Sequence, residues 1–193
     1  MSYSIAVCNF LCSEGRRKIL EYYRKDSCIV TAAIALDVLK HFGIHAKPIP
    51  VTTIIFNEAM VQCVEHYGHF PTEQEAQEWV NEYGVWSIGI GARENDAEVG
   101  KWNGHLVVCC ENRILDLSLD QATRPKYKIH LEPLYERIKP EFFKDKPIIY
   151  TQNKCAVTYR STDDQTFRQT KDWKAQRRQI VVQAIISAFP KLI

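Results

Sequence analysis

The sequence predicts a mixed α+β fold, because helical segments come first, strand-like segments follow, and both kinds mix toward the C-terminus. Its length of 193 residues suits one well-buried domain. With 46% hydrophobic and 25% charged residues, the composition is that of a globular protein and excludes long disordered or fibrous stretches. We therefore expect a single domain over residues 1–193, with its core at 14–122 and a C-terminal extension at 123–193.

The first two predicted elements are helices. Residues 14–25 have apolar side chains on one side of a helix and charged ones on the other. Residues 28–42 follow as a more buried helix, because its central part carries no charge. Asp26 or Ser27 can cap its N-terminus, and Gly43 can end it in the left-handed conformation.

The middle of the chain predicts strands and two further helices. Residues 47–56 are β-branched after Pro48 and Pro50, and the prolines mark the edge or the entry of a strand. Thr72-x-x-Glu75 is a capping box that starts a helix at 73–83. The other elements expected here are a helix at 58–66 and strands at about 85–90, 104–110 and 114–119. The expected buried stripe of the 73–83 helix is Ala76, Trp79, Val80 and Tyr83.

The C-terminal part predicts a short helix near 133–143, a hairpin around Asn153 and a terminal helix at about 172–188. Between residues 164 and 193, six basic residues stand against two acidic ones. We expect a docked helix with a solvated basic face, and the alternative is a nucleic-acid or partner-protein contact through that face. The basic residues are Arg168, Lys171, Lys174, Arg177, Arg178 and Lys191, and the expected apolar stripe is Trp173, Ile180, Val181, Ala184, Ile185 and Ala188.

Charge and cysteine usage bear on the compartment and the partners. The net charge is only +2, so we do not expect nucleic-acid binding. No apolar run approaches the ~20 residues that cross a bilayer, and no basic residue precedes the apolar stretch at the N-terminus, as it would in a secretory signal. The seven cysteines are an odd number, which argues against a disulfide framework. We expect a cytoplasmic protein with reduced thiols and no membrane segment.

Cys28 is the first candidate for chemistry. It opens the buried helix predicted at 28–42, where unpaired backbone N–H groups and the positive end of the helix dipole favour a thiolate. The thiolate is the nucleophilic form of the side chain, and the backbone N–H of Cys28 could help to hold an oxyanion. The alternative is a buried cysteine that only packs.

His105 is the second candidate, because it begins the first strand of a predicted hairpin. Alternation places Asp116, Ser118 and Asp120 on one face of the return strand. An Asp on the histidine face can orient the imidazole and stabilise its protonated form. The alternative is an ordinary edge hairpin with its polar residues outward and a solvated histidine.

The turn of this hairpin decides which carboxylate faces the ring. A two-residue turn at Glu111-Asn112 puts Asp116 and Asp120 on the two diagonals from His105, within side-chain reach. A two-residue turn at Asn112-Arg113 sets Asp120 directly opposite His105 and moves Asp116 away. A three-residue turn puts both carboxylates on the other face.

Together these segments resemble the papain-like/transglutaminase-like superfamily of cysteine enzymes, in particular its small bacterial and phage members. The resemblance covers about residues 26–122 and rests on three motifs in order: a Cys that opens a long helix, a His on a strand after Gly, and an Asp-x-Ser on the neighbouring strand. The motifs are Ser27-Cys28 with the apolar helix that ends in His41-Phe42-Gly43-Ile44, Gly104-His105-Leu106-Val107-Val108, and Ile114-Leu115-Asp116-Leu117-Ser118-x-x-Gln121.

The resemblance implies a single papain-like domain in which a nucleophile helix packs on an antiparallel sheet, with a helix at the C-terminus. It also implies a catalytic triad of Cys28 as nucleophile, His105 as base and then acid, and Asp116 as the orienting carboxylate, with a thioester intermediate and no metal or organic cofactor. We expect hydrolysis or deamidation of an amide in a protein, peptide or small molecule. The alternatives are a transglutaminase or N-acyltransferase with an amine acceptor, and a non-catalytic binding protein on the same scaffold.

Two positions depart from the family pattern. Papain-type peptidases have a Gln six residues before the Cys, where this chain has Tyr22. The usual aromatic residue after the Cys is replaced by Ile29 and Val30. The substitute donors for an oxyanion are Gln121, Tyr22 and Tyr23, and the sequence does not select among them.

Metal and phosphate sites are less well supported. His41/His45 and His66/His69 have ligand-like spacing, but Gly43 interrupts the first pair and no Cys-x-x-Cys accompanies either. There is no phosphate-binding loop of the Gly-x-x-x-x-Gly-Lys type. Cys109 and Cys110 alternate across a strand, and we expect both to be structural.

Overall fold

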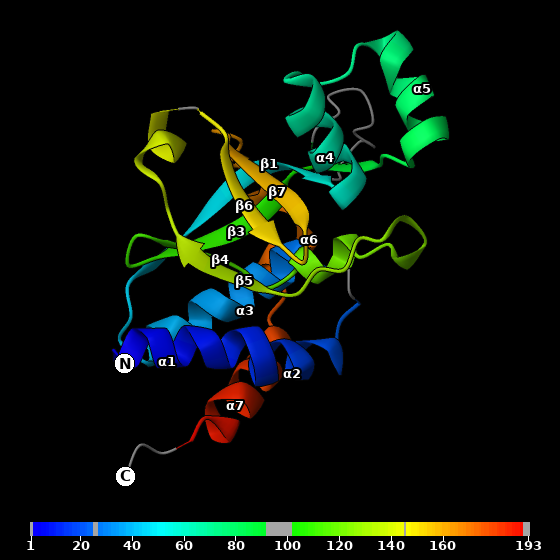
Figure 1. Cartoon of the computed structure of the whole chain (residues 1–193). Coiled ribbons are helices and arrows are strands. Elements are labelled where there is room, and N and C mark those ends of the chain that lie inside the picture. The colour runs from blue at the N-terminus through cyan, green and yellow to red at the C-terminus, as the bar shows by residue number, and fades with distance from the viewer. Residues whose placement is uncertain (1, 25–26, 92–101, 145, 191–193) are drawn as a thin grey trace.

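The computed structural model describes residues 2–24, 27–91, 102–144 and 146–190 (Figure 1). Its centre is a curled antiparallel sheet in which seven strands are paired in the order β5-β4-β3-β1-β7-β6, with β2 also paired to β1. The end strands of this path come close enough for the Tyr150 hydroxyl of β6 to donate to the Arg137 carbonyl of β5 at 2.6 Å. The strands are β1 (Ala46–Phe56), β2 (Ser87–Ile90), β3 (His105–Cys110), β4 (Arg113–Asp116), β5 (Leu134–Arg137), β6 (Ile148–Gln152) and β7 (Cys155–Ser161).

β1 lies in the middle of the sheet, and its two halves pair with different strands. Its first half, 46–51, pairs with β3, and its second half, 51–56, pairs with β7 on one side while 53–56 pair with β2 on the other. Among the described strands, β1 therefore pairs only with β3 at Pro48 and Pro50, in agreement with the prediction that these prolines mark the edge or the entry of a strand.

The two faces of the sheet bury two apolar clusters. On one face, α3 (Cys28–His41) packs together with α1 (Tyr3–Phe10) and α7 (Arg178–Ala188) against side chains such as Leu106 and Leu115. The other face lies inside the curl, where Val107 and Ile114 meet Val157 and Tyr159. Figure 1 shows α3 and the N-terminal helix lying across the same side of the sheet.

The first helix begins much earlier than predicted. Ser2 caps it through a hydrogen bond from Ile5 N, and it continues through α1, a π-helical turn at Leu11–Gly15 and α2 (Arg16–Leu20). The predicted helix at 14–25 is therefore wrong at both ends. The buried residues Val7, Cys8 and Leu11 extend the apolar stripe one turn at a time toward the N-terminus.

Two more segments differ from the prediction. The predicted short helix near 133–143 is instead β5, which pairs with β4, followed by a 3-10 turn at Pro140–Lys144. Prolines at 133 and 140 bound a segment too short for a stable helix, so pairing with β4 decides its structure. Residues 134–161, expected as part of an extension, thus supply three strands to the central sheet.

The helices α4 (Glu58–Tyr67) and α5 (Glu73–Tyr83) form a separate small layer at one end of the sheet (Figure 1). The capping box of Thr72 and Glu75 is present with both of its hydrogen bonds. The predicted stripe is wrong in part, because Val80 and Tyr83 are 38% and 40% exposed and only Trp79 is fully buried. The reason is that this layer has a small core of its own, made of Met60, Cys63, Trp79 and Val85.

The predicted hairpin around Asn153 is confirmed, with Asn153 and Lys154 both at positive φ. The predicted terminal helix is divided into α6 (Lys171–Lys174) and α7, because the backbone of Ala175 is extended, and the Arg178 guanidinium donates to the carbonyls of Trp173 and Ala175 at this break. The buried stripe of α7 is Val181, Val182 and Ile185, whereas Ile180 is 63% exposed, contrary to prediction.

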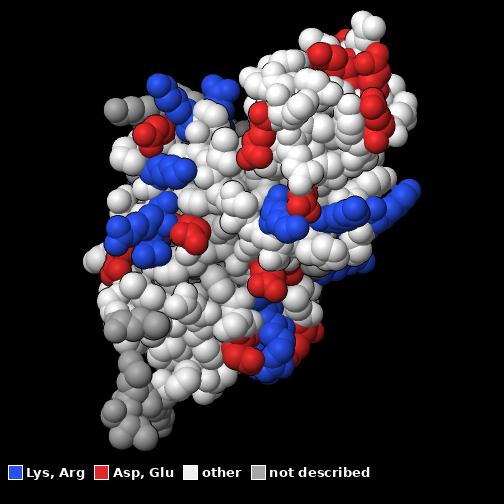
Figure 2. Space-filling view, in the orientation of Figure 1, with Lys and Arg blue, Asp and Glu red and all other residues white. Residues whose placement is uncertain are grey.

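Much of the expected basic face contacts the domain itself. Arg178 forms an ion pair with Asp37 of α3 at 2.8 Å, and Arg177 lies over the ring of Tyr23. Arg168 lies over the rings of Phe167 and Trp173, and Lys191 is outside the described residues. These contacts agree with a docked C-terminal segment. Figure 2 shows basic and acidic side chains interspersed on the face in view, with acidic ones gathered over α5.

Candidate functional site

The β3–β4 hairpin has the two-residue turn at Glu111-Asn112, one of the three turns that the sequence leaves open. Both turn residues have positive φ, 46° and 61°, as a hairpin turn that follows the twist of its strands requires. The register pairs Cys110 with Arg113 and Cys109 with Ile114. Continued along the strands, this register puts Asp116 on a diagonal from His105.

His105 and Asp116 form a fully buried pair. The ring Nε2 of His105 lies 2.7 Å from Asp116 Oδ2, and both side chains are 0% exposed. Asp116 also accepts from the Tyr159 hydroxyl at 2.9 Å and from the backbone N–H of Ser118 at 3.0 Å. Because each carboxylate oxygen has a donor, the ring is fixed with Nε2 toward Asp116 and Nδ1 toward the opposite side.

Tyr159 is a member of this network that the sequence does not predict. It comes from β7, 43 residues after Asp116 in the chain, and its ring is fully buried inside the curl of the sheet. Only the pairing of β7 with β1 brings it to the site, and the sole local signal is that it lies on the inward face of β7 with Val157 and Cys155.

The charges of the pair stabilise each other. Burial lowers the pKa of His105, but the negative charge of Asp116 and the hydrogen bond to it outweigh burial and raise the pKa to about 10. Burial raises the pKa of Asp116, but the charge of His105 and the hydrogen bonds from His105, Tyr159 and Ser118 lower it below its usual range. An imidazolium facing a carboxylate is therefore the stable form of the pair near neutral pH.

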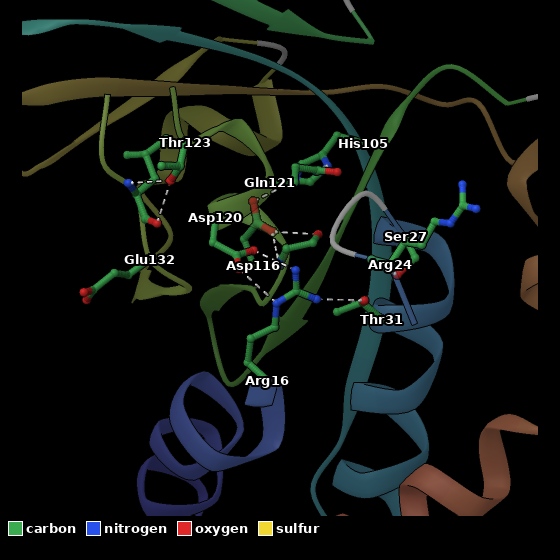
Figure 3. A network of polar contacts seen from close by, with 12 residues as sticks. Arg16, Arg24, Ser27, Thr31, His105, Asp116, Asp120, Gln121, Thr123 and Glu132 are labelled. Atoms are coloured by element: carbon green, nitrogen blue, oxygen red, sulfur yellow. Dashed lines mark hydrogen bonds and ion pairs between the residues drawn. The ribbon is translucent and has the colours of Figure 1, made fainter. Parts of the chain in front are cut away.

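Cys28 lies at the first position of α3, beside the histidine. Its Sγ is 4.0 Å from the carbonyl oxygen of Gly104, the residue before His105, and hydrogen bonding and charge from Cys28 add to the rise in the pKa of His105. Ser27 occupies the cap position, but its hydroxyl donates to the Arg24 carbonyl and does not cap the helix (Figure 3). Asp26, the other predicted cap, lies outside the described residues.

Asp120, the alternative carboxylate, does not pair with His105. Its two carboxylate oxygens accept from Arg16 of α2 at 2.7 and 3.4 Å, and the same guanidinium donates to the Thr31 hydroxyl in α3 (Figure 3). Arg16 is almost fully buried and was not among the predicted site residues. This ion pair joins α2 and α3 to the 3-10 turn at Leu119–Ala122.

Gln121 follows Asp120 in that turn and contacts the other nitrogen of the ring. Its Nε2 lies 3.2 Å from His105 Nδ1 (Figure 3). Among the donors that the sequence leaves open, Tyr22 is 53% exposed and the Tyr23 ring lies beneath Arg177.

Trp102 covers the backbone next to the histidine and was also not predicted. A Cβ atom added at Gly104 would lie 2.2 Å from the Trp102 ring, so only glycine fits beneath this indole. The indole N–H donates to Asp164 at 2.7 Å, and the ring packs near Phe167. A segment about 60 residues later in the chain thus holds the start of the strand that carries His105 in place.

The remaining candidates from the sequence are Cys110 and the possible metal ligands. Cys110 is fully buried and its Sγ lies 4.0 Å from that of Cys8. Within the described ranges, no group of three or more His, Cys, Asp or Glu side chains is placed to hold a metal ion. None of the described helices combines the length and the apolar character that spanning a membrane requires.

Stability should depend on pH through the buried pair. Since the pKa of His105 is raised from 6.5 to about 10, its contribution is complete below pH 6.5 and is lost as the pH rises toward 10. Since the pKa of Asp116 is lowered from 3.8, its contribution is complete above pH 3.8 and is lost below. We expect the unfolding free energy in urea to be highest between these limits. Asp116→Asn should lack the decline above pH 6.5, and parallel curves for the two proteins would contradict this assignment.

A thiol, an imidazole and a carboxylate in series are the groups that nucleophilic catalysis by cysteine requires. The thiol comes from a helix N-terminus, the imidazole and the carboxylate from adjacent strands, and the tyrosine and glutamine from two further segments. No protein-family model, curated protein or solved structure matches the chain.

Proposed function

We propose that this chain is a cysteine-dependent acyl-transfer enzyme of the papain-like/transglutaminase-like kind, with Cys28 as nucleophile, His105 as proton carrier and Asp116 as the orienting carboxylate. The observation that carries the proposal is the fully buried His105–Asp116 pair, whose second ring nitrogen is directed away from Asp116 while Cys28 lies beside the ring. A protein in which apolar residues replace a buried ion pair is often no less stable than the original. Stability alone therefore gives little reason for the buried pair of His105 and Asp116.

The reaction follows from the directions of the ring nitrogens. Nε2 is bonded to Asp116, so Nδ1 is the nitrogen that exchanges a proton with the Cys28 sulfur. The sulfur attacks the carbonyl carbon of an amide, a thioester forms, and the C–N bond breaks as Nδ1 gives its proton to the leaving nitrogen. Water then attacks the thioester, loses a proton to Nδ1, and releases the acid and the free thiol.

The acyl acceptor decides which reaction the enzyme catalyses. We favour water, hence hydrolysis or deamidation of an amide in a protein, peptide or small molecule, because no feature of the sequence marks an acyl-CoA site. An amine acceptor would give a transglutaminase or an N-acyltransferase from the same thioester. Mass spectrometry of the products with and without an added amine distinguishes the two.

The proposal is tested by alkylation with iodoacetamide at pH 7. Four of the seven cysteines are buried. The half-buried thiols of Cys12 and Cys109 have pKa values raised by burial, to about 12 for Cys12. Peptide mapping should therefore find Cys28 labelled at least ~10-fold faster than any other cysteine.

The dependence on the histidine is the second part of this test. His105→Gln should slow the labelling of Cys28, because the ring no longer accepts its proton. The matched control is His66→Gln, a histidine exposed on α4 away from the site. Labelling that ignores Cys28, or that is the same in both variants, would favour a non-catalytic binding protein on this scaffold.

A further inference from the structure

We infer that Gln121 is a catalytic residue that donates its side-chain N–H to the carbonyl oxygen of the bound acyl group, as the second oxyanion donor beside the backbone N–H of Cys28. This inference rests on the proposed function. Six residues before Cys28, where papain-type peptidases have a glutamine, this chain has Tyr22, whose side chain is exposed. Gln121 would supply the missing side-chain donor.

Gln121 is already in contact with a reacting atom. Its Nε2 lies 3.2 Å from His105 Nδ1, the nitrogen that does not face Asp116. The proton that Cys28 gives up is received at this same nitrogen. A side-chain amide held within hydrogen-bonding distance of Nδ1 is thus close to the sulfur side of the ring, where the carbonyl group must bind to be attacked.

The protonation state of the ring decides what the amide can bind. In the imidazolium form, which is stable near neutral pH, Nδ1 carries a proton and is a donor, so the ring offers no acceptor to the Gln121 N–H. In the same state the sulfur attacks, the S–C bond forms and the carbonyl electron pair moves onto oxygen. This N–H then has a negatively charged acceptor, and it keeps that bond until the C–N bond breaks and the carbonyl re-forms.

The turn that carries Gln121 is held in place by a buried ion pair. Asp120, its neighbour, is bonded to Arg16, and Arg16 also donates to Thr31, three residues after Cys28 in α3. The Gln121 carbonyl accepts from Arg124, and its backbone N–H donates to the Ser118 carbonyl. An oxyanion donor stabilises the transition state only when it is held in position before the reaction, and these contacts provide that.

The experiment compares two reagents on the full chain. Acylation of Cys28 by p-nitrophenyl acetate passes through a tetrahedral oxyanion, whereas alkylation by iodoacetamide displaces iodide and forms none. Gln121→Ala should lower the rate of acylation about 100-fold and leave alkylation within about twofold of the unmodified protein. Cys28→Ala supplies the background of each reaction, and Gln62→Ala, an exposed glutamine on α4, is the matched control.

Gln121→Glu keeps the size of the side chain, so it tests the same point if the alanine variant folds poorly. An ionised carboxylate has no N–H to donate, and acylation should fall as in Gln121→Ala while alkylation persists. Equal loss of both reactions would assign Gln121 a structural role, and unchanged acylation would overturn the inference, as would an unmodified protein that is alkylated at Cys28 but not acylated. If neither reagent selects Cys28 in the unmodified protein, the proposed function itself fails.

Discussion

Asp116→Asn is expected to lower the rate of Cys28 acylation by p-nitrophenyl acetate by about 10⁴-fold, the loss seen when the carboxylate of a Ser-His-Asp triad becomes an amide. The physical reason is that the His105 ring is 0% exposed, so no water can replace the charge that stabilises its protonated form. Alkylation should fall as well, because the imidazolium also stabilises the thiolate that attacks iodoacetamide. This pattern differs from that of Gln121→Ala, which affects acylation alone.

The control for this variant is Asp37→Asn, which removes a carboxylate on the same helix as Cys28 that is paired with Arg178. Its acylation rate should be close to that of the unmodified protein. Tyr159→Phe should lie between the two, because it removes one of the hydrogen bonds to Asp116 and leaves the charge. An Asp116→Asn protein that is folded and acylates at an unchanged rate would exclude Asp116 from the mechanism.

The parts of the site that sequence patterns predict are those with local signals. Cys28 at the start of an apolar helix is a local pattern, and so is the alternation that puts His105 and Asp116 on their strands. What the pattern leaves open is the turn between the strands, since Glu111 is not a residue type that favours positive φ. In the structure the Glu111 carboxylate accepts from the Ser4 hydroxyl, so a contact with the N-terminal helix supports a turn that its own residues do not select.

The parts that could not be predicted depend on contacts distant in sequence. Tyr159 reaches Asp116 only because β7 pairs with the middle of β1, and β5 is a strand only because β4 is available beside it. Arg16 looks like an ordinary charged residue of a surface helix until the N-terminal helix is packed against α3. Each of these outcomes is decided by tertiary packing, which overrides local propensity. Such packing cannot be recognised from a short stretch of sequence.

Arg16→Met should lower the unfolding free energy by about 3 kcal/mol, the smaller end of the range for a broken buried ion pair. The side chains of Arg16 and Asp120 are 4% and 13% exposed, so the carboxylate left behind regains only limited contact with water. Methionine keeps most of the length and the apolar stem of arginine, which separates loss of the charge from loss of packing. Denaturation in urea at pH 7 measures the change.

The neighbouring residue provides the comparison, because Arg17 also forms ion pairs, with Glu14 and Glu21, but its side chain is 59% exposed. Arg17→Met should leave the stability almost unchanged, since exposed pairs are screened by water and salt. Arg16→Met should also slow acylation more than alkylation at temperatures where it remains folded, because the turn that carries Gln121 loses its attachment to α3. If Arg16→Met matches Arg17→Met in stability and in both reactions, the buried pair neither supports the fold nor positions the glutamine, and Gln121 must be held by its own turn alone.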